Sequence, residues 1–89
     1  MSVVRVPPVL RQEAGGKREV HASGATVREL LEDLTAKLPA LGSRVYGEGE
    51  IRSFVNVYVD GEDVRTRNGI DTPVGETSTV ILLPAMAGG

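Results

Sequence analysis

The N-terminal part of the chain has the alternating apolar and polar pattern of a β-hairpin. Residues 2–6 predict a strand that ends at Pro7-Pro8 or shortly after. Ala14-Gly15-Gly16 is typical of a turn, and residues 17–22 are expected to return as a second strand beside the first. We expect the first strand to lie centrally in a sheet.

A helix is predicted next, because Thr26-Val27-Arg28-Glu29 matches a capping box, in which the glutamate reaches back to the cap residue. Apolar residues then form one stripe at helical spacing, which consists of Val27, Leu30, Leu31, Leu34 and Leu38. The stripe could dock a partner helix, but a domain this small needs it to cover its own sheet. Pro39 is expected to end the helix, and residues 40–52 are predicted to be mostly loop, since glycines interrupt any period.

The strongest strand pattern lies at residues 53–59. Two faces alternate along it, one with Val55, Val57 and Val59, the other with Phe54, Asn56 and Tyr58. Asp60-Gly61 predicts a hairpin turn, after which residues 62–65 return as a short strand.

The last strand is predicted at residues 77–83, after turns at Asn68-Gly69 and residues 73–76. Both of its faces are apolar, Val80 with Leu82 and Ile81 with Leu83. We therefore expect a central strand whose second face is covered, for example by a partner. Pro84 is expected to stop the ladder, so that residues 84–89 project as a flexible arm.

The order strand, strand, helix, strand, strand, strand limits the fold. Two hairpins separated by a helix, with the last strand beside the first, give a mixed sheet of about five strands that wraps one main helix. We predict an α+β fold and a single domain over residues 1–89.

Composition narrows the class of protein. With 89 residues, 40% hydrophobic and 25% charged, the chain is an ordinary small globular domain, and without a leader or a long apolar run we expect it in the cytoplasm. Ten basic and twelve acidic residues without a basic block argue against nucleic-acid binding. The absence of cysteine excludes disulfides, thiolate metal sites and a cysteine nucleophile.

Internal residues offer weak candidates for chemistry. His21 is interpreted as a strand surface residue, because no second ligand or nucleophile accompanies it. Asp60, Glu62 and Asp63 are interpreted as a solvated acidic turn, because their spacing fits no calcium loop. Gly47-Glu48-Gly49 lacks the rest of a dinucleotide fingerprint, and Arg65-Thr66-Arg67 is interpreted as a solvated loop.

The C-terminal Gly88-Gly89 is the stronger candidate. Residues without a Cβ can thread a narrow channel, and they leave the carbonyl carbon unhindered. The α-carboxylate of Gly89 is a poor electrophile until a partner activates it, and we expect activation as an acyl-adenylate. The alternative is an inert terminus, because disordered chain ends are common.

These features together resemble a known family. The element order is similar to the β-grasp of ubiquitin-like proteins, and a diglycine after the last strand is similar to the sulfur carriers of the MoaD/ThiS family. Residues 54–59, 62–65 and 83–89 resemble in particular the branch that serves actinobacterial cysteine synthesis.

The resemblance implies a sulfur carrier that is a protein co-substrate and not an enzyme. An E1-like adenylyltransferase and sulfurtransferase would use ATP to activate Gly89 and would convert it to a thiocarboxylate. A pyridoxal-phosphate (PLP) dependent cysteine synthase, or another sulfur-accepting synthase, would take the sulfur, and a zinc metallopeptidase would release cysteine. ATP, PLP and zinc belong to these partners, and this chain itself is expected to bind no cofactor, metal, nucleic acid or membrane.

The resemblance also implies roles for single residues. Gly89 would carry the acyl group, Gly88 would permit passage, and Met86 with Ala87 would enter the partner's channel. An outer-face docking patch would consist of Ile81, Leu83, Phe54 and Tyr58, for which simple partial burial in the sheet is the alternative.

Other functions stay open at this point. The chain could be a ubiquitin-like modifier that joins Gly89 to lysines, a sulfur donor for molybdopterin, thiamine or thio-natural-product synthesis, or a passive β-grasp adaptor with an incidental tail. An independent enzyme is the least favoured reading, because no nucleophile, metal cluster or acid/base pair stands out.

Overall fold

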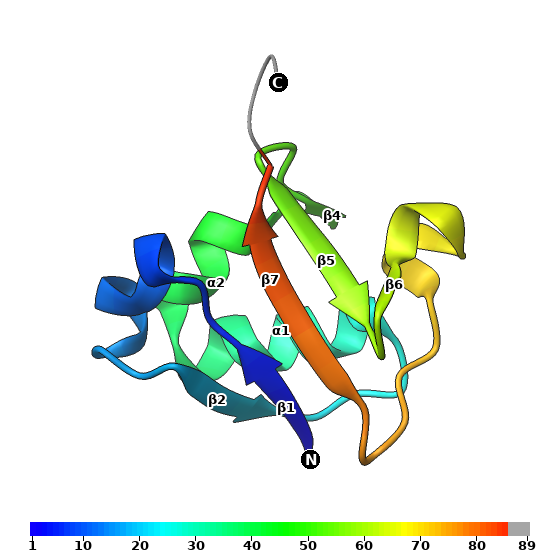
Figure 1. The fold of residues 1–89 in the computed structure, drawn as a ribbon, viewed down its shortest axis with the longest axis horizontal. Helices are drawn as coiled ribbons and strands as arrows, with labels where there is room; N and C mark the ends of the chain where they lie inside the picture. Colours follow the sequence, from blue (N-terminus) through cyan, green and yellow to red (C-terminus); the bar gives the residue numbers. More distant parts are fainter. Residues whose placement is uncertain (86–89) are drawn as a thin grey trace.

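The computed structural model describes residues 1–85. A five-stranded sheet in the order β2-β1-β7-β5-β6 lies in front of helix α1 in the view of Figure 1. The elements are β1 (Ser2–Arg5), β2 (Glu19–Ala22), α1 (Val27–Lys37), β5 (Val55–Val59), β6 (Glu62–Asp63) and β7 (Thr79–Pro84). β1 and β7 are parallel and the other neighbouring strands are antiparallel, so the mixed α+β sheet predicted from the element order is confirmed.

The predicted N-terminal hairpin is present, but its connection is longer than a turn. β1 pairs with β2 from Ser2 opposite Ala22 to Arg5 opposite Glu19. Between them lies the 3-10 helix η1 (Pro8–Ala14), which the alternation in the sequence did not indicate. Proline fits the first turn of such a helix, and Gly15 ends it in the left-handed region at φ 69°.

Helix α1 begins and ends where the sequence predicts. Thr26 Oγ1 accepts from the Glu29 N–H at 3.2 Å, while the Glu29 carboxylate accepts from the Ala25 N–H at 3.0 Å, one residue before the expected cap nitrogen. The apolar stripe lies in the core, with Val27, Leu30, Leu31 and Leu34 fully buried. The helix therefore covers its own sheet.

The prediction of a loop at residues 40–52 is wrong. Pro39 ends α1 as expected, but it is also the first residue of α2 (Pro39–Val45), a position that suits proline. A two-stranded sheet of β3 (Tyr46–Gly47) and β4 (Glu50–Ile51) follows. Its turn residues, Glu48 at φ 55° and Gly49 at φ 77°, have the left-handed backbone of a two-residue hairpin loop.

The β5–β6 hairpin differs from its prediction only at its ends. β5 begins at Val55, and Asp60 at φ 50° and Gly61 at φ 90° form the predicted turn. β6 covers two residues, because the Asp63 carboxylate accepts from the Arg65 N–H and begins the 3-10 helix η2 (Val64–Thr66).

β7 is the central strand, as predicted, but Pro84 does not stop its ladder. Pro84 lies opposite Val55, and the Ala85 N–H still donates to the Phe54 carbonyl at 2.8 Å. Antiparallel pairs alternate between hydrogen-bonded and non-hydrogen-bonded, and this bond makes the Val55–Pro84 pair the second kind. A missing N–H therefore costs β7 no bond to β5 at this position.

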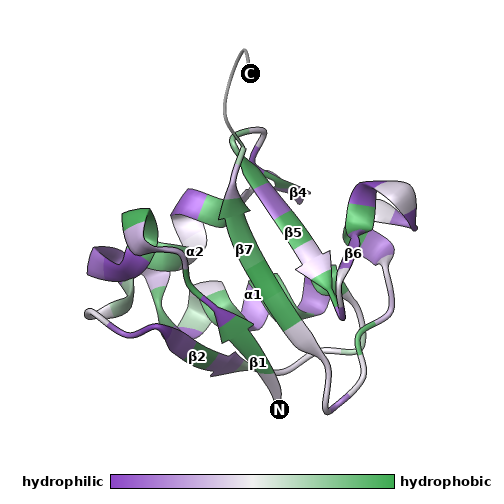
Figure 2. Cartoon of the chain, in the orientation of Figure 1, coloured by the Kyte–Doolittle hydropathy of each residue, from purple (hydrophilic) through white to green (hydrophobic). Residues whose placement is uncertain are grey.

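The core lies between the sheet and the two helices. The apolar members with 0% exposure are Val4, Ala22, Val27, Leu30, Leu31, Leu34, Leu41, Val45, Val80 and Leu82. Figure 2 shows β1 and β7 as hydrophobic strands in the middle of the sheet, while β2 at one edge is more hydrophilic. None of the helices formed by residues 1–85 has the length and apolar character needed to cross a lipid bilayer.

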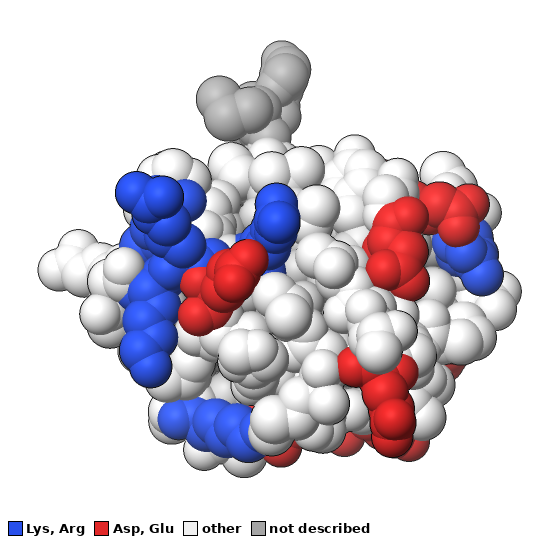
Figure 3. Space-filling model, turned by 60° about the horizontal axis from the view of Figure 1, so that its bottom comes forward, with Lys and Arg blue, Asp and Glu red and all other residues white. Residues whose placement is uncertain are grey.

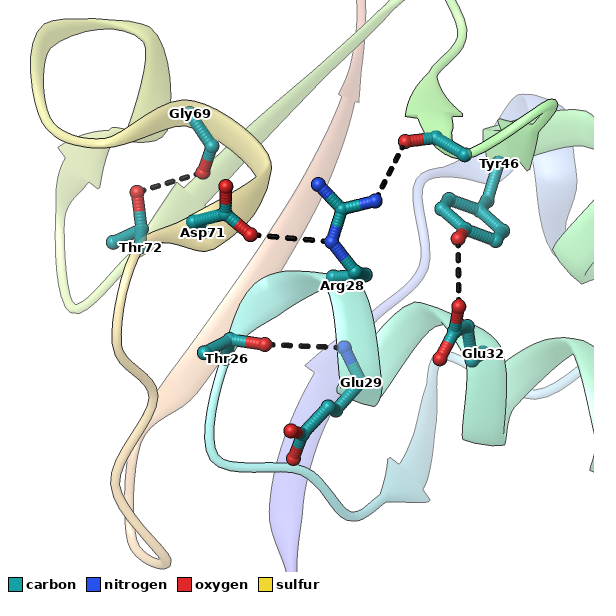
Figure 4. A network of polar contacts seen from close by, with 9 residues as sticks. Thr26, Arg28, Glu29, Glu32, Tyr46, Gly69, Asp71 and Thr72 are labelled. Carbon is teal, nitrogen blue, oxygen red and sulfur yellow. Dashed lines mark hydrogen bonds and ion pairs between the residues drawn. The ribbon is translucent and has the colours of Figure 1, made fainter.

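Polar contacts fasten the start of α1 to two loops (Figure 4). Arg28 donates from Nε to Asp71 Oδ1 at 3.1 Å and from Nη1 to the Gly49 carbonyl at 3.1 Å. The Tyr46 hydroxyl donates to Glu32 Oε2 at 2.9 Å. The β3–β4 hairpin and the 3-10 helix η3 (Gly69–Asp71) are thereby joined to one helix.

Candidate functional site

The residues predicted to carry the chemistry lie beyond the part of the chain that the structure describes. These are the predicted acyl carrier and its neighbour, Gly89 and Gly88, and the predicted partner contacts Met86 and Ala87. The structure places the strand that leads to them. β7 is held on one side by β1 and on the other by β5, and its inward residues Val80 and Leu82 are fully buried.

The four residues of the predicted docking patch lie together on the sheet face opposite α1. Tyr58 lies opposite Ile81, and Phe54 accepts the backbone hydrogen bond from Ala85. Phe54 is 48% exposed and Leu83 is 41% exposed, while Tyr58 and Ile81 are half-buried. We call Phe54, Tyr58, Ile81 and Leu83 the outer-face patch; its role in docking stays a prediction.

Exposure separates two kinds of residue within the outer-face patch. Partial burial by the neighbouring strands accounts for Ile81 and Tyr58 without a partner. It does not account for Phe54 and Leu83, which are two of only four large hydrophobic residues exposed in the described part of the chain. Single exposed apolar residues are common on proteins, but these two lie on neighbouring segments of the sheet at the same end of the central strand.

Charged side chains frame the outer-face patch on both sides. Arg5 lies opposite Ile81 on the β1 side, and Asp63 lies opposite Tyr58 on the β6 side. The Asp63 carboxylate accepts from Arg65 Nη2 at 2.9 Å, and this guanidinium lowers the pKa of Asp63. An apolar centre with a polar rim is the usual composition of a protein–protein interface.

Asn56, opposite Leu83 on the same strand pair, was not singled out from the sequence. Its Oδ1 atom is buried and has no hydrogen-bond partner among the described residues. Asn56 also lines a hollow of about 400 Å³ beside β5, together with Arg52, Val64 and Arg65 among others. A strand pattern predicts which face a residue occupies but cannot predict whether its polar atoms find partners.

The acidic turn after β5 is a structural feature, as predicted. The Asp60 carboxylate accepts from the Thr79 N–H and from the Ser78 hydroxyl, both at 2.9 Å. Both bonds lower the pKa of Asp60, and the bond from the Thr79 N–H has the larger effect. Glu62 forms an ion pair with Arg67. Within residues 1–85 no group of three His, Asp or Glu side chains is placed to hold a metal ion.

Two further predictions concern charged residues. His21 lies exposed on the edge strand β2 opposite Val3, as expected of a strand surface residue. Arg65 and Arg67 are exposed, as expected of a solvated loop, but each pairs with an acidic residue of β6.

Comparison with known proteins agrees with this arrangement. Residues 4–89 match the model of the ThiS family. The chain is 38% identical over 89 residues to the sulfur carrier protein CysO of Mycobacterium tuberculosis, which covers 97% of this chain and 96% of that protein.

Solved structures give the same relationship. The chain resembles one in the crystal structure of the Amycolatopsis orientalis BexX/CysO complex, with a TM-score of 0.89 and 38% identity over 100% of both chains. It also resembles the small archaeal modifier protein 1 of Methanosarcina acetivorans in solution, with a TM-score of 0.84 and 27% identity over 99% of this chain and 95% of the other. The ubiquitin-like β-grasp fold predicted from the sequence is confirmed.

Proposed function

We propose, from the premise that the chain belongs to the ThiS family and is a sulfur carrier, that the sulfur is held as a thiocarboxylate at Gly89. The observation that supports this most is the position of the outer-face patch. It includes Ile81 and Leu83 of the final strand, from whose end the chain continues toward Gly89. An enzyme that binds there has the C-terminal residues within its reach.

The proposed chemistry takes place in two steps on a partner enzyme. A carboxylate oxygen of Gly89 first attacks the α-phosphorus of ATP and pyrophosphate leaves, which gives an acyl-adenylate. A sulfide sulfur then attacks the carbonyl carbon, the bond from that carbon to the AMP oxygen breaks, and AMP leaves with its electron pair. Gly88 and Gly89 suit both steps, because no Cβ restricts the backbone or shields the carbonyl carbon.

The outer-face patch is proposed to bind the E1-like partner that carries out these steps. Phe54 and Leu83 supply exposed apolar area, and half-buried Tyr58 and Ile81 continue the surface. Met86 and Ala87 are proposed to enter the channel of the partner, where methionine adapts its shape readily. This chain positions its C-terminus by docking, and the partner binds and uses the ATP.

Mass spectrometry of the intact protein tests the proposal. Incubation with an adenylating partner, ATP, magnesium and sulfide is expected to increase the mass by the difference between a sulfur and an oxygen atom. A chain without Gly88 and Gly89 is the matched control and is expected to show no increase. If the full chain keeps its mass with every E1-like enzyme of its genome, the proposal fails.

Cysteine synthesis is the proposed destination of the sulfur. The chain is 38% identical to a sulfur carrier named CysO, and its residues 54–59 and 83–89 resemble that branch. A PLP-dependent synthase would add the thiocarboxylate to an aminoacrylate formed from phosphoserine, and a zinc metallopeptidase would release cysteine. The expected product is the chain with one cysteine residue added, seen as an increase in mass that requires both the synthase and phosphoserine.

A ubiquitin-like modifier is the second candidate, because the fold also matches a small archaeal modifier protein. In that case Gly89 would form isopeptide bonds with lysines of other proteins. Peptides that carry the C-terminal segment of this chain on a lysine side chain, found after digestion of cell extract, would support this function. Trypsin would leave residues 68–89 on the lysine, because Arg67 is the last Lys or Arg in the sequence. A passive adaptor would instead keep its binding partners after removal of Gly88 and Gly89.

A further inference from the structure

Three arginines that are separated in the sequence line one hollow. The hollow has a volume of about 360 Å³ and is lined by Arg5, Val6, Arg11, Arg18 and Glu19. Arg5 comes from β1, Arg11 from η1, and Arg18 from the residue before β2. The sequence does not indicate this cluster, because no two of these arginines are neighbours along the chain.

Two of the three guanidinium groups, those of Arg5 and Arg11, contact a neighbouring acceptor. Arg11 Nε donates to the Val6 carbonyl at 3.1 Å, which fixes the side chain across the end of β1. Arg5 Nε lies 3.5 Å from Glu19 Oε2, and both of these side chains are more than half exposed, at 61% and 51%. Glu19 is the one acidic residue in the lining, so three cations face one anion there.

The charge of the chain is divided unevenly. Residues 1–22 contain four basic and two acidic residues, a net charge of +2, whereas the remaining residues contain six basic and ten acidic residues, a net charge of −4. Figure 3 shows Lys and Arg side chains gathered on one side of the molecule and mainly acidic side chains on the other. The hollow is therefore a positive region on a protein of negative net charge.

The hollow borders the outer-face patch. Arg5 pairs in register with Ile81 across β1 and β7, and it pairs with Glu19 on its other side. The order across this row of the sheet is therefore β2, β1, β7 and β5, with Glu19, Arg5, Ile81 and Tyr58. A protein that covers the outer-face patch and extends toward β2 also covers the hollow.

We propose that the hollow binds an acidic segment of the partner protein that docks on the outer-face patch, an inference that rests on the proposed function. Guanidinium groups bind carboxylates through paired N–H donors, and several arginines around one hollow fit several carboxylates of one segment. Charges at the border of an interface act mainly on the rate of encounter and on its salt dependence. The hollow orients the carrier so that β7 points toward the catalytic centre of the partner.

The test measures association with the E1-like partner that thiolates the chain, by stopped-flow fluorescence at low and high ionic strength. Neutralising two arginines in R11Q/R18Q is expected to slow association at low salt by roughly tenfold and to flatten its salt dependence. The control K37Q/R67Q removes the same charge elsewhere, on α1 and after η2, and is expected to change the rate less than twofold.

The mass assay separates this proposal from the proposed function. R11Q/R18Q is expected to reach full thiocarboxylate at saturating partner, because Gly88 and Gly89 are intact. If the unmodified chain forms no thiocarboxylate, the proposed function fails. If it does, and R11Q/R18Q associates like K37Q/R67Q at every salt concentration, the hollow binds no acidic segment. The single variant R18Q keeps the hydrogen bond from Arg11 to Val6, so it tests the charge of the hollow without loss of that bond. If R18Q associates at the same rate as the unmodified chain at every salt concentration, the hollow likewise binds no acidic segment.

Discussion

Asp60 illustrates how one side chain holds two strands. It follows β5 in the left-handed region at φ 50°, where Asp and Asn are better tolerated than most residues. From there its carboxylate accepts hydrogen bonds from Ser78 and Thr79 at the start of β7. The turn of the β5–β6 hairpin and the beginning of the central strand are thereby joined.

The hydrogen bonds of Asp60 predict a pH-dependent stability. Because they lower its pKa in the folded state, their contribution is present above the ordinary aspartate pKa of about 3.9 and is lost as the pH falls through the lower folded value. Asp60→Asn is expected to lower the melting temperature at pH 7, and the difference should shrink below about pH 4. Melting curves from neutral to acidic pH measure this, with Glu76→Gln as an exposed control of equal charge change.

Asn56 predicts the opposite effect on stability. A buried polar atom without a partner costs about 1–3 kcal/mol, and Asn56 Oδ1 is such an atom among the described residues. Asn56→Val removes it and suits a strand, so the free energy of unfolding is expected to rise by about 1 kcal/mol. Asn56→Asp, which places a charge at the same position, is expected to lower it. Chemical denaturation measures the free energy of unfolding of both variants. A less stable Asn56→Val would show that Oδ1 is paired in solution.

At the scale of elements, the contact of α1 with α2 depends on one glycine. A Cβ on Gly42 would lie 2.3 Å from Thr35 Oγ1 and 2.4 Å from Thr35 Cα, closer than real contacts. The two helices can therefore approach only because position 42 has no side chain. Glycine disfavours a helix, so Gly42 made α2 difficult to predict from the sequence. The same residue allows α2 to pack against α1.

Gly42→Ala tests this packing, because propensity and sterics predict opposite signs. Alanine stabilises a helix by about 1 kcal/mol relative to glycine, whereas overpacking of the helix contact lowers the free energy of unfolding by about 1–3 kcal/mol or more. We expect a net loss of stability in chemical denaturation. Ser43→Ala, at the exposed neighbouring position, is the control and is expected to change stability by less than about 0.5 kcal/mol. A stabilised Gly42→Ala would contradict the close approach of the helices.

At the scale of the whole molecule, stability and proposed function use opposite faces of β7. Its inward residues pack against the helices, and its outward residues form half of the outer-face patch. A central strand is suited to this arrangement, because β1 and β5 hold its backbone from both sides. The chain that continues toward Gly89 thus starts from the best-supported strand of the sheet.

Neighbouring leucines of β7 are expected to separate these two uses. Leu82 is fully buried, so Leu82→Ala should lower the free energy of unfolding by about 2–5 kcal/mol. Leu83 is 41% exposed, so Leu83→Ala should change stability little and should slow thiocarboxylate formation at limiting partner. Melting curves and the mass assay on both variants measure the two effects. Unchanged thiolation of Leu83→Ala would remove Leu83 from the docking surface.

Local pattern was enough to predict most of the fold. Period-two alternation identified the strands of the five-stranded sheet but not β3 and β4, the capping box located α1, and Asp60-Gly61 located a hairpin turn. These features depend on residues that are close in the sequence, so the sequence alone contains them. The outer-face patch was predicted from the family resemblance, and alternation contributed only the separation of Leu82 and Leu83 onto opposite faces of the strand.

The remaining features of the protein depend on contacts between residues that are distant in the sequence. Pro84 stays in the ladder because of its register with β5, and Gly42 lies in a helix because of its contact with α1. The hollow forms because β1, η1 and the start of β2 bring Arg5, Arg11 and Arg18 together. Side-chain periodicity reports which way a residue faces, whereas packing and strand register determine what it meets there.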